Sequence, residues 1–409
     1  SGIVVFTVAS LVGGLSESAG MLVGARAVQG VSAAIVAPAT LTVLGTTFTE
    51  PAAKARAFGI WGGVVGFGGA FGVLAGGALT ELSWRWTLFV NVPIGIVLAV
   101  GAALVISEYR GSAAGSKLDV LGAVCITGGL MAIVYGIVEA ERYGWGSGRV
   151  LASLAGGLVL LALAAVDQFK IASEPLIPPG VFRFRGLSAA NGVAFAGGAA
   201  MFSMFYFMTL FLQGILDYSP MRTGLAYLPL ALAILVGAVP AGKFVQNVGA
   251  RPLLLTGSVL CAGGLLWLSR IDEHSTFAAD VLGPTMLIGF ALGVLMAAVT
   301  VAGTSALPLH QTGLGSGLIN ATRQLGGALG LALLVTIAGH RTKDLLAGGA
   351  SADHASVDGF ALALAWSALF PAVAAVIALA VPRKQAAGPA KEPPAPPRPE
   401  AISTSATED

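Results

Sequence analysis

The chain has 409 residues and a formal net charge of +2; 56% of its residues are hydrophobic and only 10% are charged. Soluble proteins carry roughly 25% charged residues, so these charges are too few to cover a soluble protein of this length. Apolar runs of roughly 20 residues recur throughout, each long enough to cross about 30 Å of hydrocarbon as a helix. The composition indicates a polytopic membrane protein surrounded by membrane lipid, and the near-neutral charge gives no sign of nucleic-acid binding.

Twelve candidate membrane spans follow in chain order, which predicts an all-α integral membrane protein. They cover residues 2–16, 21–47, 57–79, 86–106, 118–139, 150–166, 190–213, 222–241, 252–269, 279–305, 316–339 and 360–381. The opening "SGIVVFTVAS" has neither an initiator Met nor a basic region typical of a signal peptide, so we expect a chain that is already under way. The two cysteines, Cys125 and Cys261, fall in apolar runs and favour helix packing over a disulfide.

Basic residues in the connections predict the orientation, because they are enriched on the cytoplasmic side. With the first span starting inside, the outer set is Arg85, Arg142, Arg149, Arg222, Arg270, Arg341 and Lys343. The cytoplasmic set is larger and comprises Lys54, Arg56, Arg110, Lys117, Lys170, Arg183, Arg185, Lys243, Arg251, Arg383, Lys384, Lys391 and Arg398. Both ends of the chain are therefore expected in the cytoplasm, including a disordered, Pro-rich tail over 382–409.

An internal repeat relates the third span to the eleventh. The run "GIWGGVVGFGGAFGVL" from Gly59 aligns without gaps on "GLINATRQLGGALGLA" from Gly317. These spans lie eight helices apart, which suggests two six-helix halves separated by two extra helices. Under this layout, two helices are missing from the front of the first half.

Several motifs resemble one family. The run "LVGARAVQGVSAAIVAP" looks like the fourth-helix signature of the major facilitator superfamily, and "GFGGAFGVLAGGAL" is similar to its fifth-helix antiporter motif. The segments "WRWTLFVNVPIG", "PLIPPGVFRFRG" and "GLINATRQLGGALG" resemble the fourteen-helix drug:proton antiporter branch at matching places. Two positions depart from the family pattern: Val73 stands where a proline is usual, and Gln246 stands where an aspartate is usual.

The resemblance implies a layout with 12 transmembrane helices present of a presumed 14. A partial N-terminal bundle of four helices would occupy 1–106, two linker helices and a loop 107–186, and a complete C-terminal six-helix bundle 187–381. The first-helix carboxylate often found in this branch would lie in the missing part. We therefore expect residues 1–409 alone to be inactive as a proton-coupled pump.

Two arginines lie inside apolar, glycine-rich runs: Arg26 in "GARAVQGVSAA" and Arg323 in "LINATRQLGGALG". An arginine at the bilayer centre costs on the order of 2.5 to 3.5 kcal/mol by insertion scales, so it normally faces the bundle interior or a wet cavity. Steps of three or four residues from each arginine reach small or polar residues on one helix face. We predict a transport and coupling path formed by Arg26, Gln29, Gly30, Asn320, Arg323 and Gln324. The alternative is that the arginines cap backbone carbonyls between helices.

Three further groups are candidates for function. The antiporter-motif glycines Gly68, Gly72, Gly76 and Gly77 would share one face for tight, conformation-dependent helix contact or for static packing. A possible substrate cavity, or a lipid-facing or core surface, is formed by Asn191, Phe195, Phe202, Phe205, Tyr206 and Gln213. The resemblance implies a cytoplasmic loop motif at Gly242, Lys243, Gly249 and Arg251.

Secondary transport is the function that these features favour. A membrane enzyme would need paired carboxylates, a metal set or an activated nucleophile, whereas the four histidines are scattered; no catalytic residue and no metal site is predicted. A receptor or scaffold would be expected to carry a long soluble insertion, and none is present in the sequence.

We expect a monomeric multidrug exporter of a bacterial cytoplasmic membrane. It would exchange an amphipathic, cationic or neutral small molecule for protons, with the proton gradient as energy source and no cofactor. The alternatives are a dedicated exporter of one endogenous metabolite or antibiotic, and an inactive, N-terminally truncated fragment.

Overall fold

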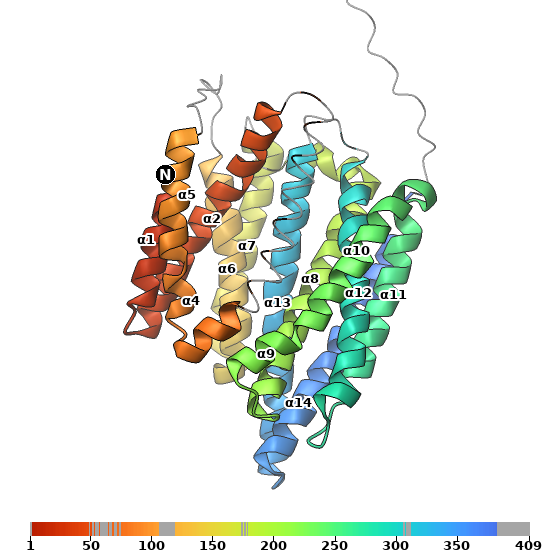
Figure 1. Cartoon of the computed structure of the whole chain (residues 1–409). Coiled ribbons are helices and arrows are strands. Elements are labelled where there is room, and N and C mark those ends of the chain that lie inside the picture. Colours follow the sequence, from red (N-terminus) through yellow and green to blue (C-terminus); the bar gives the residue numbers. More distant parts are fainter. Residues whose placement is uncertain are drawn as a thin grey trace, which may run out of the picture.

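The computed structural model describes residues 2–48, 50, 75–105, 119–172, 175, 177, 179–305, 307 and 312–382, with single positions between 53 and 72. Regular structure in these residues is helical throughout (Figure 1). The first group of helices comprises α1 (Gly2–Gly14), α2 (Ala19–Thr47), the helical segment 75–82, α4 (Trp86–Phe89) and α5 (Asn91–Val105). A hairpin follows, made of α6 (Val120–Tyr143) and α7 (Gly148–Val166) with the π-helical η1 (Asp167–Ile171).

The second group of helices begins after the 3-10 helix η2 (Pro179–Arg183). It comprises α8 (Arg185–Gly214), α9 (Pro220–Ala226), α10 (Leu228–Val248), α11 (Ala250–Leu268), η3 (Phe277–Val281), α12 (Leu282–Thr304), α13 (Thr312–Ala347), α14 (Ala352–Ser367) and α15 (Leu369–Ala378). Most of the buried apolar side chains lie in this group, around Met204, Phe207, Phe211 and Leu265.

Ten described helices are long and apolar enough to cross a membrane, and each overlaps a span predicted from the sequence. The predicted span 2–16 corresponds to the shorter apolar helix Gly2–Gly14. The predicted span 57–79 lies largely outside the described residues, as does the tail from 383. The all-helical, multi-pass character is thus confirmed, while the counts of 12 and 14 helices stay predictions.

Serine caps explain where several helices begin. Ser18, Ser147, Ser219 and Ser351 each accept a hydrogen bond from a backbone N–H in the first turn of α2, α7, α9 and α14. Such a cap satisfies an N–H group that has no partner within the helix. All four caps lie in turns at the same end of the molecule, the lower end in Figure 1.

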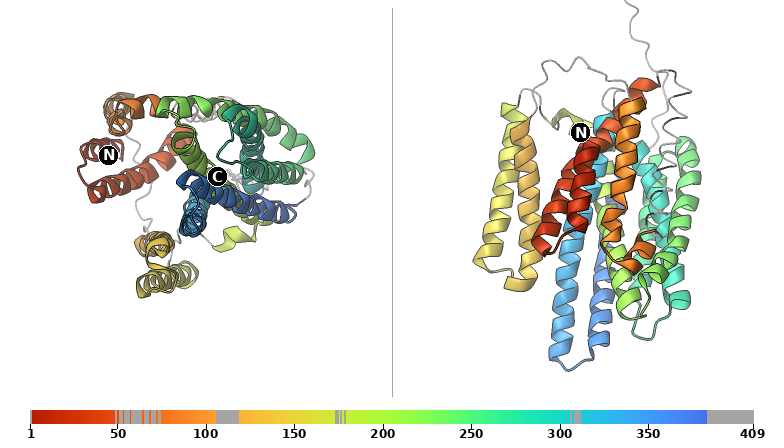
Figure 2. Two further views of the ribbon diagram at one scale, coloured as in Figure 1. Left: turned by 90° about the horizontal axis from the view of Figure 1, so that it is seen from below. Right: turned by 60° about the vertical axis from the view of Figure 1, so that its left-hand side comes forward.

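The α6–α7 hairpin is held together by close backbone contact and stands beside α13. A Cβ atom added at Gly157 would lie 2.7 Å from the Gly129 carbonyl oxygen, so the two glycines let the helices approach closely. The Thr336 hydroxyl of α13 donates to the Ile137 carbonyl of α6 at 3.4 Å. Seen from below in Figure 2, the hairpin lies at the periphery, next to α13.

Two helix crossings in the second group depend on glycine. Added Cβ atoms at Gly198 and Gly326 would overlap the backbones of Arg323 and Phe195 respectively, so α8 and α13 meet backbone to backbone. The α10–α12 crossing has the same character, because a Cβ atom at Gly289 would lie 2.7 Å from the Leu230 carbonyl oxygen. Small residues at both crossings thus fix the positions of α8, α12 and α13.

Adjacent glycines on α8 provide a matched test of the crossing. We expect Gly198→Ala to lower the free energy of unfolding by roughly 1 to 3 kcal/mol, because the new methyl group overlaps the α13 backbone. Gly197→Ala is the control, since no described atom lies within 4 Å of its Cβ position. The apparent thermal unfolding midpoint of the purified protein should fall only for Gly198→Ala. An equal effect of both substitutions would contradict the backbone contact.

Candidate transport path

Arg26 belongs to a hydrogen-bond chain that joins α2 to α1. Its Nη1 atom donates to Oε1 of Gln29 at 2.8 Å, and Nε2 of Gln29 donates to the Ser10 hydroxyl at 2.5 Å. Ser10 in turn donates to the Phe6 carbonyl at 2.7 Å. Gln29 and Ser10 are buried, whereas Arg26 is exposed. The buried amide therefore holds the guanidinium at the surface of the α1–α2 pair. Among the described residues, the hydrogen-bond partner of Arg26 is this side-chain amide and not a backbone carbonyl.

Neighbouring Gly30 is exposed, and no described atom lies within 4 Å of its Cβ position. It lies beside the Arg26 chain on α2 without making a tight helix contact to the described residues.

Arg323 lies on α13 where this helix crosses α8. Its Nη2 atom donates to Oδ1 of Asn320 at 2.6 Å, one turn earlier on the same helix. Its Nε atom is buried and has no hydrogen-bond partner among the described residues. The Thr322 hydroxyl donates to Oδ1 of Asn191 on α8 at 2.8 Å, which adds a side-chain bond to the backbone contact. The predicted neighbour Gln324 is exposed.

A cavity of about 80 Å³ lies between α8, α12 and α13, and Arg323 is part of its wall. Apart from Arg323 and Thr300, its lining side chains are apolar. The lining from α8 is Val193, Ala194, Gly197 and Met201, that from α12 is Leu292, Leu295, Met296, Val299 and Thr300, and that from α13 is Ile319 and Arg323. The α12 wall could not be predicted from the sequence, because that span is almost uniformly apolar.

The aromatic face predicted on α8 lies elsewhere. None of the six residues predicted for a substrate cavity lines this one. Phe202 packs against Gly327 of α13, where an added Cβ atom would lie 2.6 Å from the ring. Phe205 lies 5.0 Å from the Tyr227 ring, and Tyr206 lies 5.3 Å from the Phe207 ring. Asn191 is buried, and Gln213 is exposed at the end of α8. The helical period predicted that these residues share one face of α8. On that face, Phe202 packs against α13 and Phe205 packs against Tyr227.

Of the four antiporter-motif glycines, Gly77 brings the two groups of helices together. A Cβ atom added at Gly77 would lie 2.6 Å from the Pro220 carbonyl oxygen and 3.3 Å from Cα of Met221, both at the start of α9. No described atom lies within 4 Å of the Cβ positions of Gly68, Gly72 and Gly76. The role of these three glycines stays a prediction.

The residues of the predicted cytoplasmic loop motif lie mostly in helices: Gly242 and Lys243 in the last turns of α10, Gly249 at the link, and Arg251 in the first turn of α11. Gly249 adopts a φ of +83°, a backbone conformation that residues other than glycine rarely adopt. Its N–H donates to the Val245 carbonyl at 2.9 Å and ends α10. Gly242 and Lys243 are exposed and Arg251 is half-buried, while the side chain of Gln246 lies outside the description. The structure thus explains Gly249 as a helix stop and leaves the role of Lys243 and Arg251 a prediction.

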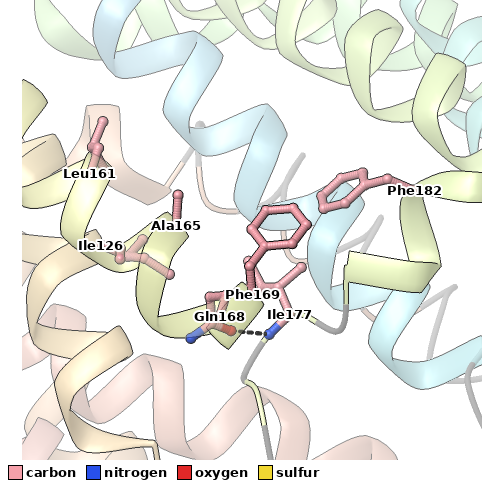
Figure 3. A pocket seen from close by; sticks show the side chains of 8 residues that line it. Ile126, Leu161, Ala165, Gln168, Phe169, Ile177 and Phe182 are labelled. Atoms are coloured by element: carbon pink, nitrogen blue, oxygen red, sulfur yellow. Dashed lines mark hydrogen bonds between the residues drawn. The ribbon is translucent and has the colours of Figure 1, made fainter. Parts of the chain in front are cut away.

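A second cavity, of about 190 Å³, lies between the α6–α7 hairpin and η2 (Figure 3). Phe169, Ile177 and Phe182 supply apolar lining, and the Gln168 amide oxygen accepts a hydrogen bond from the Ile177 N–H at 2.8 Å. None of the predicted site residues lines it. In the part of the chain that the structure describes, no group of three or more His, Cys, Asp or Glu side chains could hold a metal ion.

Comparison with known proteins identifies the family. Residues 1–331 match the family described as Major Facilitator Superfamily. The chain belongs to this superfamily. A crystal structure of a bacterial homologue of the human lysosomal transporter Spinster, inward-facing and unoccupied, shares the fold: its TM-score is 0.63 at 15% identity, over 93% of this chain and 81% of that one.

Three relatives in this superfamily are named as resistance or export proteins. The chain is 39% identical to the puromycin resistance protein pur8 of Streptomyces alboniger, over 88% of this chain and 71% of that protein. It is 40% identical to the cephamycin export protein CmcT of Amycolatopsis lactamdurans, over 83% of this chain and 71% of that protein. It is 32% identical to the tetracenomycin C resistance and export protein of Streptomyces glaucescens, over 84% of this chain and 64% of that protein. The resemblance to drug-exporting major facilitator proteins is therefore confirmed.

The contact at Gly77 can be tested from the opposite side of the interface. We expect Gly77→Val to force the segment 75–82 away from α9, because the side chain overlaps the Pro220 carbonyl. A thiol introduced by Met221→Cys should then react severalfold faster with a water-soluble maleimide. Gly76→Val is the matched control and should leave the rate unchanged. The native Cys125 and Cys261 are buried and can be replaced in the background. Equal rates in the two variants would contradict the contact.

Proposed function

We propose that the protein exports amphipathic small molecules across a bacterial cytoplasmic membrane in exchange for protons. The observation that carries this proposal is the 39–40% identity to a resistance protein and an export protein over more than four fifths of the chain. The two arginines inside helices of the two groups support it, because intramembrane charges typically mark transport paths. The proton gradient would supply the energy, with no cofactor and with a single chain as the working unit.

Under this proposal Arg26 belongs to the coupling machinery. Its guanidinium is permanently charged, so it acts by stabilising the ionised form of a neighbouring acid and does not itself carry the proton. Through Gln29 its position depends on α1 as well as α2. A relative shift of these helices would therefore move the charge.

Replacement of Arg26 tests the proposal. We expect Arg26→Ala to reduce uptake driven by a pH gradient to the rate of protein-free vesicles, while membrane insertion and purified yield stay unchanged. The measurement uses reconstituted vesicles, an imposed pH gradient and three fluorescent amphipaths of different charge: the cation rhodamine 6G, the neutral N-phenyl-1-naphthylamine and the anion 1-anilinonaphthalene-8-sulfonate. Arg149→Ala, which removes an exposed arginine of the α6–α7 hairpin, is the matched control. Gradient-driven uptake by Arg26→Ala at the wild-type rate would refute a coupling role.

We further propose that the end carrying the serine-capped turns faces outside and that both chain ends face the cytoplasm. The seven basic residues predicted outside lie in or beside segments at this end. The described members of the predicted cytoplasmic set lie in or beside segments at the opposite end, and these are Lys170, Arg183, Arg185, Lys243 and Arg251. Gly146→Cys, in the α6–α7 turn, should be labelled by an impermeant maleimide in intact cells. Gly388→Cys, in the tail, should be labelled only after permeabilisation. The reverse pattern would overturn the orientation.

A further inference from the structure

The cavity between α8, α12 and α13 combines an apolar wall with one cation. Arg323 closes the α13 side, and Met201 and Met296 are among the apolar side chains from α8 and α12. This combination suits a molecule with an apolar part next to one polar group of defined charge. The charge of Arg323 therefore decides which class of molecule binds.

No carboxylate of the described helices that line this cavity neutralises the cation. The helices α8, α10, α11 and α12 contain no Asp or Glu. The acidic residue of α13, Asp344, lies roughly 31 Å from Arg323 along the helix axis. In the first group of helices, α1, α2 and α5 contain no acidic residue either. A cation in an apolar environment is stabilised by an opposite charge, and the three helices that line this cavity supply none near Arg323.

The hydrogen-bonding capacity of Arg323 points the same way. A guanidinium has five N–H donors, and one hydrogen bond, to Asn320, is formed with the described residues. The buried Nε has no partner there. Planar guanidinium groups bind carboxylates, sulfonates and phosphates through paired hydrogen bonds, which are stronger than bonds between neutral groups.

We propose that this cavity binds the acidic group of the transported molecule, so that the substrate is an amphipathic anion. Its carboxylate, sulfonate or phosphate lies against Arg323, and the adjoining apolar part lies against α8 and α12. A volume of about 80 Å³ holds the acidic group and its first apolar neighbours, while the remainder of the molecule extends from the mouth. The inference rests on the proposed export function and deepens it, and it replaces the cationic or neutral substrate expected from the sequence.

The test measures binding, without any gradient. The probes are 1-anilinonaphthalene-8-sulfonate and N-phenyl-1-naphthylamine, which share one ring system and differ by the sulfonate. Saturable binding to the purified chain in phosphatidylcholine nanodiscs is measured by equilibrium dialysis, with empty nanodiscs as background. The variants are Arg323→Gln, Arg323→Lys and Gly197→Leu, with Arg149→Gln as a control for net charge. The Gly197 Cβ position has no described atom within 4 Å, so the leucine fills the cavity.

We expect the wild type to bind the sulfonate probe at least about tenfold more tightly than the neutral probe, as one charge-assisted pair provides. Arg323→Gln should abolish this preference, and Arg323→Lys should keep part of it. Gly197→Leu should weaken both probes equally, and Arg149→Gln should behave as wild type. Thermal unfolding midpoints establish that each variant is folded. If Arg323→Gln fails to fold, the probe preference of Arg323→Lys still tests the role of the charge at this position.

Several outcomes would overturn the inference. Equal affinities in the wild type, or an unchanged preference in Arg323→Gln, would show that Arg323 does not select anions. Loss of the preference in nanodiscs that contain phosphatidylglycerol, compared at equal free probe and after subtraction of empty nanodiscs, would identify an anionic lipid headgroup as the occupant. Gradient-driven export of rhodamine 6G by a protein without the anion preference would overturn the substrate class and leave the proposed export function standing. Anion preference without gradient-driven transport of any probe would support the anion site and overturn the proposed export function.

Discussion

The backbone contact between α8 and α13 is the constraint on which the candidate site depends. Gly198 and Gly326 sit opposite the backbones of Arg323 and Phe195, so neither helix can move sideways without losing the contact. In a lipid environment, where apolar burial gives little preference for one helix partner over another, such close packing is a main source of specificity. It also fixes the starting point of the Arg323 side chain, and a long flexible cation is thereby kept next to the wall formed by α12.

Hydropathy predicted the helices well because a span must satisfy its backbone internally and be apolar outside. It predicted their ends less well. The span predicted at 316–339 belongs to a helix that runs over Thr312–Ala347, and the span predicted at 190–213 begins at Arg185. Helical hydrogen bonding continues into the polar interface, whereas hydropathy reports only the hydrocarbon. Arg341 and Asp358, which pair at 2.6 Å between α13 and α14, illustrate this continuation.

Part of the candidate site could likewise be predicted from the sequence, and part could not. Arg26 and Arg323 could be found from the sequence, because a charge within an apolar run has an energetic cost that needs an explanation. The wall from α12 could not, since Leu292, Leu295 and Val299 look like any other apolar residues. For the aromatic residues of α8 the sequence left two readings open, a substrate cavity or a packed surface, because a helical period defines a face but does not say what that face contacts. The ring of Phe202 meets Gly327, whose small size is what admits it.

The two arginines are held differently, and this difference suits different roles under the proposed function. Arg26 is tied through Gln29 to Ser10 on another helix, so its surroundings change whenever α1 and α2 shift relative to each other. Arg323 is bonded to Asn320 on its own helix and moves with α13. A conformational equilibrium responds only to groups whose interactions differ between the two states. Arg26 therefore suits a role in sensing helix movement. Arg323 suits a role in holding a ligand. The ligand contacts that differ between the two conformations would then come from the opposite half of the molecule.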